Sequence, residues 1–462
     1  MRYLAATLFQ LDYLINLLGT GSGMILAALI MIMFLFSFGR PGRWVVLAIL
    51  LFTSTLSFGT DALQNPLIAP LQQMRFAAEP ITLMLLIFLV IPSFLSQGAP
   101  LRTPVLAAAI VFWTLEMTYS AHVAISAELQ RGVLSMVIFT TILVVMGIGM
   151  PRWFRGLQDV QAAARCMGAA ALLFILGTTA QLLVNQSAII HSNRLYAITS
   201  NPQHAAFILA ILLIPISVLL ASSREPKALR ILWGATAGVA VAMIIWTGSR
   251  TGVLTALVGI GLLFRRRIGT FLGVGFVIAI FVFFFLAIFK PDTAATSRLV
   301  STLDTRTGVW MLQFQRFQAN PFFGTMSQTD YTAAESSYLT IAAHTGILGL
   351  ALLGGVLWFM TTAIRRLRRL RATLRIEDDR LLVDWAPAGL IAILIGAFFE
   401  GVLVGTINFM LLGIYFYLAI LKFLSDKNTI ELAEQHALNW TEIDPAPEPY
   451  HPRPFLDAPA AL

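Results

Sequence analysis

The chain has 462 residues, of which 58% are hydrophobic and 12% are charged, with a mean hydropathy of +0.81 and a formal net charge of +8. This composition excludes an ordinary soluble globular protein, since such proteins carry about twice this share of charged residues. It predicts an integral membrane protein. The single Cys166 also excludes a framework of intramolecular disulfides.

Apolar runs of about 15 to 22 residues recur along the chain, and each is long enough for a helix to cross a hydrocarbon core of ~30 Å. The runs lack strand-like alternation, so we expect an all-α, polytopic transmembrane bundle of about 12–14 spans. Residues 4–18 form a shorter run with Asp12, which either lies in the interface or adds one span. The clearest spans cover about residues 21–38, 44–59, 81–97, 104–120, 131–150, 166–185, 204–222, 231–248, 252–264, 269–289, 341–363, 385–402 and 408–424.

Lysine and arginine concentrate in every second loop, the pattern that the positive-inside rule assigns to the cytoplasm. The basic loops lie at residues 40–43, 102, 152–165, 224–230, 265–267, 365–375 and 422–427. The loops around 60–80, 121–130, 186–203, 249–251, 290–340 and 403–407 then face the periplasm or cell exterior. Because the positive charge follows membrane orientation, it indicates no nucleic-acid partner.

Two polar segments stand apart from the apolar runs. Residues 290–340 form a long outside loop with short helices, set within a bundle that covers residues 1–424. Residues 425–462 are polar and Pro-rich and cannot build a core. We therefore predict a largely disordered cytoplasmic tail from about residue 428.

Three outside arginines lie at predicted helix ends, against the orientation rule. Arg194 precedes Asn201 and the next helix, Arg250 follows Ser249 in the glycine-flanked turn 246–252, and Arg306 precedes an amphipathic stretch. An arginine at such a position either snorkels to lipid headgroups or pairs with an acid. Together the three predict a phosphate or pyrophosphate site, since guanidinium binds such groups in bidentate fashion.

The amphipathic stretch places Trp310, Phe314 and Phe317 at spacings that share one helix face. We expect this face to pack on the bundle or lie in the interface, with direct substrate contact as the alternative. The turn residues 320–324 then end the helix.

Four short motifs in this region resemble the O-antigen ligase and polymerase superfamily of bacterial membrane glycosyltransferases. The resemblance covers about residues 190–352, and the N-terminal half is similar only as a helical bundle. The motifs are residues 194–202, residues 247–250, residues 306–310 with 320–324, and residues 335–339 with 345–349.

The resemblance implies glycan transfer from an undecaprenyl diphosphate carrier to an acceptor hydroxyl at the periplasmic face of the bacterial inner membrane, without cofactor or metal. Ligases of the family commonly have histidine where this chain has Glu335, and an acidic residue where it has His344. A carboxylate at the first position is more similar to the repeat-unit polymerases. The polymerase is therefore the preferred interpretation, with a ligase as the alternative and a chain-length regulator or export machinery as a possible partner.

The chemistry of such a transfer suggests a role for each polar residue. Arg194, Arg250 and Arg306 would stabilise the diphosphate leaving group. Glu335 would take the proton of the attacking hydroxyl with inversion at the anomeric carbon, or else is a solvated carboxylate or an arginine partner.

Four other residues each have both a functional and a structural interpretation. His344 is an acceptor-side or relay residue or a packed histidine, and because it lies nine residues after Glu335, a direct dyad requires a helix break. Tyr338 either stacks on substrate or belongs to an interfacial aromatic belt. Glu116 and Glu400, near the outside ends of their spans, either line the site or form structural pairs.

Other classes of chemistry find little support in the sequence. There is no phosphate-binding loop of an ATP-driven pump, and no Cys and His cluster with metal spacing. A transporter or flippase of lipid-linked glycan remains the rival from another class, and it predicts ionisable residues near mid-membrane and internal repeats.

Overall fold

The computed structural model of the protein describes residues 32–57, 67–95, 104–126, 129–199, 201–289, 306–325, 335–374, 376–405 and 407–443. The helices are α3 (Arg40–Leu56), α4 (Ala69–Phe76), α5 (Ala78–Leu95), α6 (Pro104–Ser126), α7 (Leu129–Ile142), α8 (Leu157–Val184), α9 (Pro202–Ala221), α10 (Lys227–Thr247), α11 (Arg250–Phe264), α12 (Ile268–Phe289), α14 (Thr307–Ala319), α15 (Ser337–Thr373), α16 (Glu377–Gly396) and α17 (Phe409–Ile443). The shorter elements are the π-helix η1 (Leu143–Gly149), the 3-10 helices η2 (Met150–Trp153) and η3 (Gln186–Ala188), and the strands β1 (Ile190–His191) and β2 (Arg194–Leu195).

Eight helical segments of the described chain are long and apolar enough to cross a membrane. They are α5, α6, α7 with its continuation through η1 and η2, α8, α9, α10, α15 and α17. This confirms the predicted all-α, multi-pass membrane protein. Residues 4–18 and most of the span expected over 21–38 lie outside the described residues.

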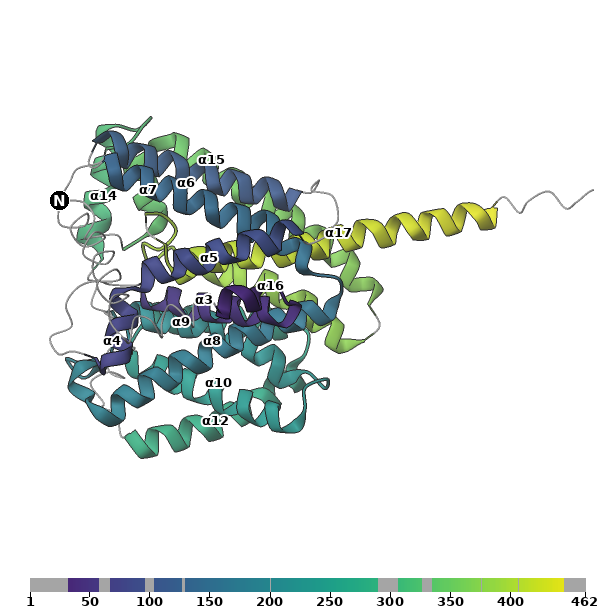
Figure 1. Cartoon of the computed structure of the whole chain (residues 1–462), viewed down its shortest axis with the longest axis horizontal. Coiled ribbons are helices and arrows are strands. Elements are labelled where there is room, and N and C mark those ends of the chain that lie inside the picture. The colour runs from purple at the N-terminus through teal and green to yellow at the C-terminus, as the bar shows by residue number, and fades with distance from the viewer. Residues whose placement is uncertain are drawn as a thin grey trace, which may run out of the picture.

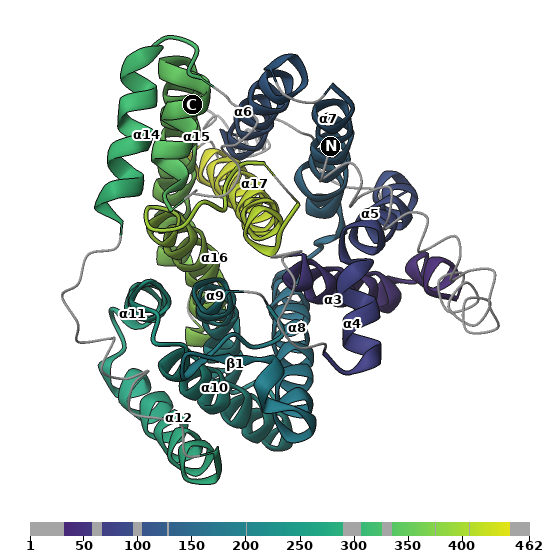
Figure 2. The same ribbon diagram turned by 90° about the vertical axis from the view of Figure 1, so that its left-hand side faces the viewer.

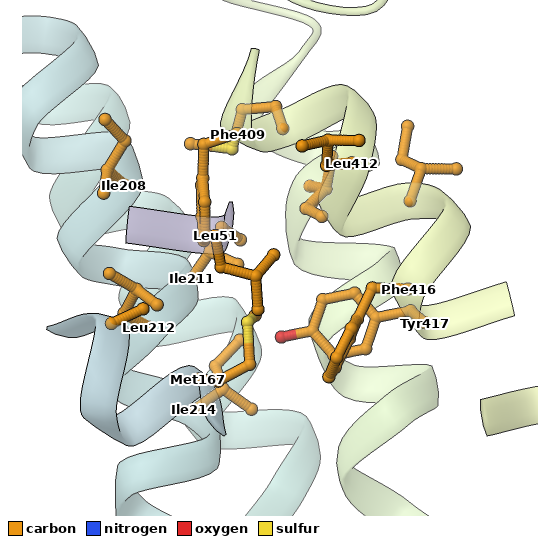
Figure 3. Packing of buried hydrophobic residues seen from close by; sticks show 14 of the residues in the cluster. Leu51, Met167, Ile208, Ile211, Leu212, Ile214, Phe409, Leu412, Phe416 and Tyr417 are labelled. Carbon is orange, nitrogen blue, oxygen red and sulfur yellow. The ribbon is translucent and has the colours of Figure 1, made fainter. Parts of the chain in front are cut away.

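The core of the bundle forms around α9 and α17. Every residue of α9 from Ala205 to Leu220 is buried, as expected for a helix that is apolar on all sides. Figure 3 shows how α9 and α17 meet α3 and α8, with Leu51, Met167, Ile211 and Phe416 in one cluster. By contrast α12 leaves Phe276, Phe283 and Phe284 exposed, which suits a helix that faces lipid.

The two ends of the bundle differ in charge. Successive helices run in alternate directions, so the basic loops gather at one end, where α17 extends beyond its neighbours in Figure 1. Acidic side chains tie these loops together there through close ion pairs. The pairs include Arg40–Asp159 at 2.7 Å, Arg165–Glu225 at 2.8 Å, Arg224–Asp379 at 2.7 Å and Arg371–Asp384 at 2.7 Å.

The opposite end carries α14 and the loops expected to face outward. Figure 2 looks onto this end and shows α14 lying beside α15 at the edge of the bundle. The described part of the long loop thus contains the expected short helix, which begins directly after Arg306 and ends at Ala319, just before Asn320. Residues 290–305 and 326–334 of this loop lie outside the described residues.

The C-terminal segment begins as part of α17. This helix continues to Ile443, past residue 428, and the predicted disordered tail stays a prediction. The first half of α17 is an apolar span, and the polar second half continues it. Extending an existing helix adds one backbone hydrogen bond for each residue ordered and avoids the cost of starting a new helix. Residues 444–462 lie outside the described residues.

Candidate functional site

The motif that begins at Glu335 fixes the start of α15 against the loop between α16 and α17. Ser336 caps α15 by accepting a hydrogen bond from the Leu339 amide. The Ser337 hydroxyl donates to the Glu400 carbonyl at 2.6 Å and accepts from the amides of Val402 and Leu403. These contacts bring the side chain of Glu400 beside Glu335, although the two residues are 65 positions apart.

Arg306 lies between these two carboxylates. Its guanidinium is 3.0 Å from Glu400 Oε1 and 3.8 Å from Glu335 Oε2. It also donates to the Thr251 hydroxyl at 3.1 Å and stacks over the Phe399 ring at 5.5 Å. One arginine therefore joins α14, the start of α11 and the α16–α17 loop.

The two carboxyl groups differ in environment. The pKa of Glu400 is raised from 4.5 to about 7, mainly by burial; the charge of Glu335 also acts to raise it, while Arg306 and the hydrogen bond from Thr251 act to lower it. The side chain of Glu335 is a third exposed, although its Oε2 is buried and accepts no hydrogen bond among the described residues. Glu335 is thus the carboxylate that can take a proton from an incoming group.

The face of α14 that carries Trp310, Phe314 and Phe317 is only partly buried. Trp310 does face inward, packing on Phe398 and Phe399 and donating to the Glu335 carbonyl at 3.4 Å. Phe314, however, is 46% exposed, and the buried residue of the helix is Gln313, which donates to the Thr340 hydroxyl at 3.0 Å. The hydrogen bond to Thr340 rotates Gln313 inward and leaves Phe314 on the outer side.

Arg194 binds the backbone at the end of α10. It lies on β2, whose hairpin with β1 turns through Ser192 and Asn193 at positive φ, as a two-residue type I′ turn requires. The Arg194 Nε donates to the Thr247 carbonyl at 2.7 Å, a group that the end of a helix leaves without a helical partner. This contact anchors the turn that leads into α11.

That turn, predicted to bring backbone close to a ligand, is built by local contacts. Gly248 ends α10 in the left-handed conformation at φ 62°. The buried Ser249 caps α11 by accepting from the Gly252 amide at 3.2 Å, and Gly252 lies directly against Ala206 of α9. Ser249 therefore acts as the cap of α11. The close backbone approach at Gly252 is to α9 within the bundle.

Arg250 and Asn201 complete the predicted set at this end. Arg250 is the first residue of α11 and is exposed, next to the Thr251 that hydrogen-bonds Arg306. Asn201 caps α9, its side chain accepting from the Gln203 amide at 2.8 Å. The side chain of Asn201 therefore has a structural role as a helix cap, and its predicted role in substrate binding stays a prediction.

Tyr338 and His344 lie deeper along α15. The Tyr338 hydroxyl donates to the Leu394 carbonyl of α16 at 2.8 Å, and its ring packs on Phe398. His344 is buried, with Nδ1 3.1 Å from the Thr325 carbonyl and its ring edge-on to Tyr119. Both side chains thus have clear packing partners.

The motif at residues 320–324 crosses the motif at residues 345–349 beside His344. The segment after α14 runs over α15 at Gly346, where the helix is interrupted by φ 63° and ψ −153°. Backbone hydrogen bonds join Thr325 to Ala343 at 2.7 Å and Ile347 to Pro321 at 2.8 Å. The helix break required for a Glu335–His344 dyad exists, but it falls after His344, so residues 337–345 remain one helix and keep His344 about two turns beyond Glu335.

Thr251 and Phe399 were not predicted to belong to the site. Glu400 was predicted either to line the site or to form a structural pair. Thr251 directly follows Arg250, so its position in the turn was a usable signal. Nothing in the sequence pairs Phe399 or Glu400 with Arg306. Within the described ranges no group of three or more His, Cys, Asp or Glu side chains could hold a metal ion.

Comparison of the chain with protein-family models and with curated proteins finds no match. The class of protein that the fold defines is therefore a multi-pass, all-α membrane protein with a charged site at one end.

Proposed function

We propose that this chain is an inner-membrane glycosyltransferase that polymerises undecaprenyl-diphosphate-linked oligosaccharide repeats at the periplasmic face. The observation that carries the proposal is the convergence of Arg306, Glu335, Glu400 and the start of α11 at the end of the bundle away from the basic loops. The motif resemblance supplies the substrate class. A site with Arg306, the adjoining Arg250 and aromatic walls at a membrane surface suits a diphosphate joined to a sugar and a lipid.

The transfer follows from the chemistry of these groups. The acceptor hydroxyl oxygen forms a bond to the anomeric carbon of the donor sugar, and the bond from that carbon to the diphosphate oxygen breaks. Glu335 takes the hydroxyl proton, and Arg250 and Arg306 stabilise the charge on the departing undecaprenyl diphosphate. Attack opposite the leaving group inverts the anomeric configuration.

Glu400 acts in this proposal as a positioning residue. Its carboxyl lies 3.0 Å from Arg306 and its pKa is about 7, so it gains or loses a proton near neutral pH. The protonated form holds Arg306 less strongly and leaves the guanidinium available to an incoming diphosphate. Binding of the donor is thereby coupled to proton uptake at Glu400.

The test is the purified protein incubated with a defined undecaprenyl diphosphate oligosaccharide, followed by sizing of the products. We expect chains of more than one repeat from the wild type and from Arg369→Ala, which lies at the basic end. We expect none from Arg250→Ala with normal folding. Normal chain growth by Arg250→Ala removes this residue from the mechanism, and no growth by the wild type contradicts the proposal.

Deletion of the gene separates polymerase from ligase. Loss of a polymerase leaves single repeats on the surface acceptor, whereas loss of a ligase leaves long chains that are not attached.

A second candidate, transport of lipid-linked glycan, is favoured by one observation. Glu116 is fully buried within α6, and buried membrane carboxylates often mark a transport path. Vesicles containing the purified protein distinguish the two functions: glycan that crosses the bilayer without extension supports the transporter and contradicts the enzyme.

A further inference from the structure

A small pocket opens at the basic end of the bundle, between α11, α15 and α16. It has a volume of about 80 Å³ and is far from the site described above, since it adjoins the opposite ends of the same helices. Its polar side is formed by Arg265, Arg368, Arg371 and Asp384. Its apolar side includes Leu262, Ile364, Pro387 and Ile391.

The charge of the pocket is unbalanced. Asp384 is already paired with Arg371 at 2.7 Å, and both side chains are 14% exposed. Arg265 and Arg368 are exposed, and neither forms an ion pair within the described parts of the chain. Three arginines against one aspartate leave a net formal charge of +2 at the mouth.

The apolar side has a structural cause in α16. Pro387 lies inside this helix and cannot donate the helical hydrogen bond to the carbonyl of Val383. Both residues line the pocket, so one backbone hydrogen bond of α16 is missing where the helix borders the pocket. Small and branched side chains, including Ala388, then leave room between the helices.

We propose that this pocket binds an anionic phospholipid, with the phosphate at Arg265 and Arg368 and the upper acyl chain against the apolar side. The positive-inside rule assigns this end of the bundle to the cytoplasmic leaflet, which carries anionic lipid. Guanidinium groups suit phosphate, and the adjoining wall suits the hydrocarbon next to it. The proposal rests on charge and shape and is independent of the glycosyltransferase reaction.

The test uses the purified, delipidated full chain in detergent, with phosphatidylglycerol and phosphatidylcholine of identical acyl chains as probes. Native mass spectrometry counts bound lipid, and thermal unfolding reports stabilisation. We expect one phosphatidylglycerol to bind and raise the Tm. The double variant Arg265→Ala, Arg368→Ala should bind it on the order of 30-fold more weakly, because each of the two arginines contributes ~1 kcal/mol toward an anionic lipid.

The matched control is Arg365→Ala, Arg369→Ala, which removes the same charge from the same end but does not line the pocket. It should bind phosphatidylglycerol as the wild type does. Equal weakening in both double variants reduces the effect to general surface charge and overturns the proposal. Equal binding of phosphatidylcholine, or an equal Tm shift from inorganic phosphate alone, overturns it as well.

Discussion

Glu335 and Glu400 share one arginine, yet their surroundings give them different properties. Glu335 is at the edge of the site, 3.8 Å from Arg306, whereas Glu400 is 4% exposed and only 3.0 Å away. The side chain of Glu335 is the more accessible of the two to an incoming group. The buried Glu400 holds the guanidinium of Arg306 in place through their ion pair.

Changing Glu335→Gln should lower product formation by at least ~100-fold, since loss of a general base typically costs 10²- to 10⁴-fold. The Tm should stay within about 2 °C of wild type, because a partly exposed ion pair at 3.8 Å contributes little stability. The measurement pairs product sizing with thermal unfolding. Glu377→Gln, at the basic end, is the control and should keep full activity.

Stability should depend on pH through Glu400. Its pKa is raised from 4.5 to about 7 in the folded protein, mainly by burial, so the folded state binds the proton more tightly than the unfolded state does. This contribution is fully present below pH 4.5 and is lost as pH rises toward 7, by on the order of 3 kcal/mol.

Thermal unfolding of wild type and Glu400→Gln between pH 5 and pH 8 measures this effect, over a window chosen to bracket the pKa of about 7. The wild-type Tm should fall more steeply with pH than that of the glutamine variant. Arg306→Ala should shift the transition to higher pH, because Arg306 lowers the pKa of Glu400. Parallel curves for wild type and Glu400→Gln contradict the assignment.

At the scale of elements, the crossing of α15 and the segment after α14 depends on two glycines. Gly324 and Gly346 both have positive φ. A Cβ on Gly324 would lie 2.3 Å from the His344 carbonyl carbon, and one on Gly346 would lie 2.4 Å from the Phe322 carbonyl carbon. Each position therefore requires glycine, because the backbone of the other segment occupies the space that a Cβ atom would need.

Gly346→Ala should destabilise the protein by about 2 kcal/mol or more, since both the backbone conformation and the contact oppose a side chain. It should also lower activity, because the crossing anchors α14 and hence Arg306. Gly354→Ala on the same helix is the control: its Cβ would meet nothing within 4 Å, so Tm should be unchanged or slightly raised. Equal Tm values for the two variants would contradict the packing argument.

The sequence predicted α14 and the turn after it from spacing and turn residues, and the structure has both. It could not predict which face of α14 is buried. Apolar periodicity favoured Trp310, Phe314 and Phe317, but the hydrogen bond from Gln313 to Thr340 exposes Phe314. A buried hydrogen bond between distant segments can override a local apolar pattern.

At the scale of the whole molecule, the bundle separates two kinds of charge. One end has basic loops paired with acids of neighbouring loops, as in Arg40–Asp159 and Arg165–Glu225. The other has the Arg306 site. The structure distinguishes the ends, and the positive-inside rule predicts which faces the cytoplasm.

Cysteine labelling in cells measures that orientation. The native Cys166 is buried, so an introduced cysteine should be the reactive one. Asn193→Cys, in the exposed turn at the site end, should react with an impermeant maleimide added outside the inner membrane. Ala372→Cys, exposed at the basic end, should react only after lysis, and the reverse pattern would contradict the predicted orientation.

The sequence by itself determined the class of fold, because hydropathy and loop charge act locally: each apolar run must become a helix in lipid, and each basic loop resists transfer. It also determined which motifs carry polar groups near helix ends. Only the tertiary structure decided the partners within the site. Arg306 meets Glu400 across 94 positions. Gly324 lies against the backbone of His344, and Gly346 against that of Phe322, at a crossing that neither segment encodes alone. Such pairings depend on how helices pack against one another, and that packing is set by the whole core rather than by any single stretch of residues.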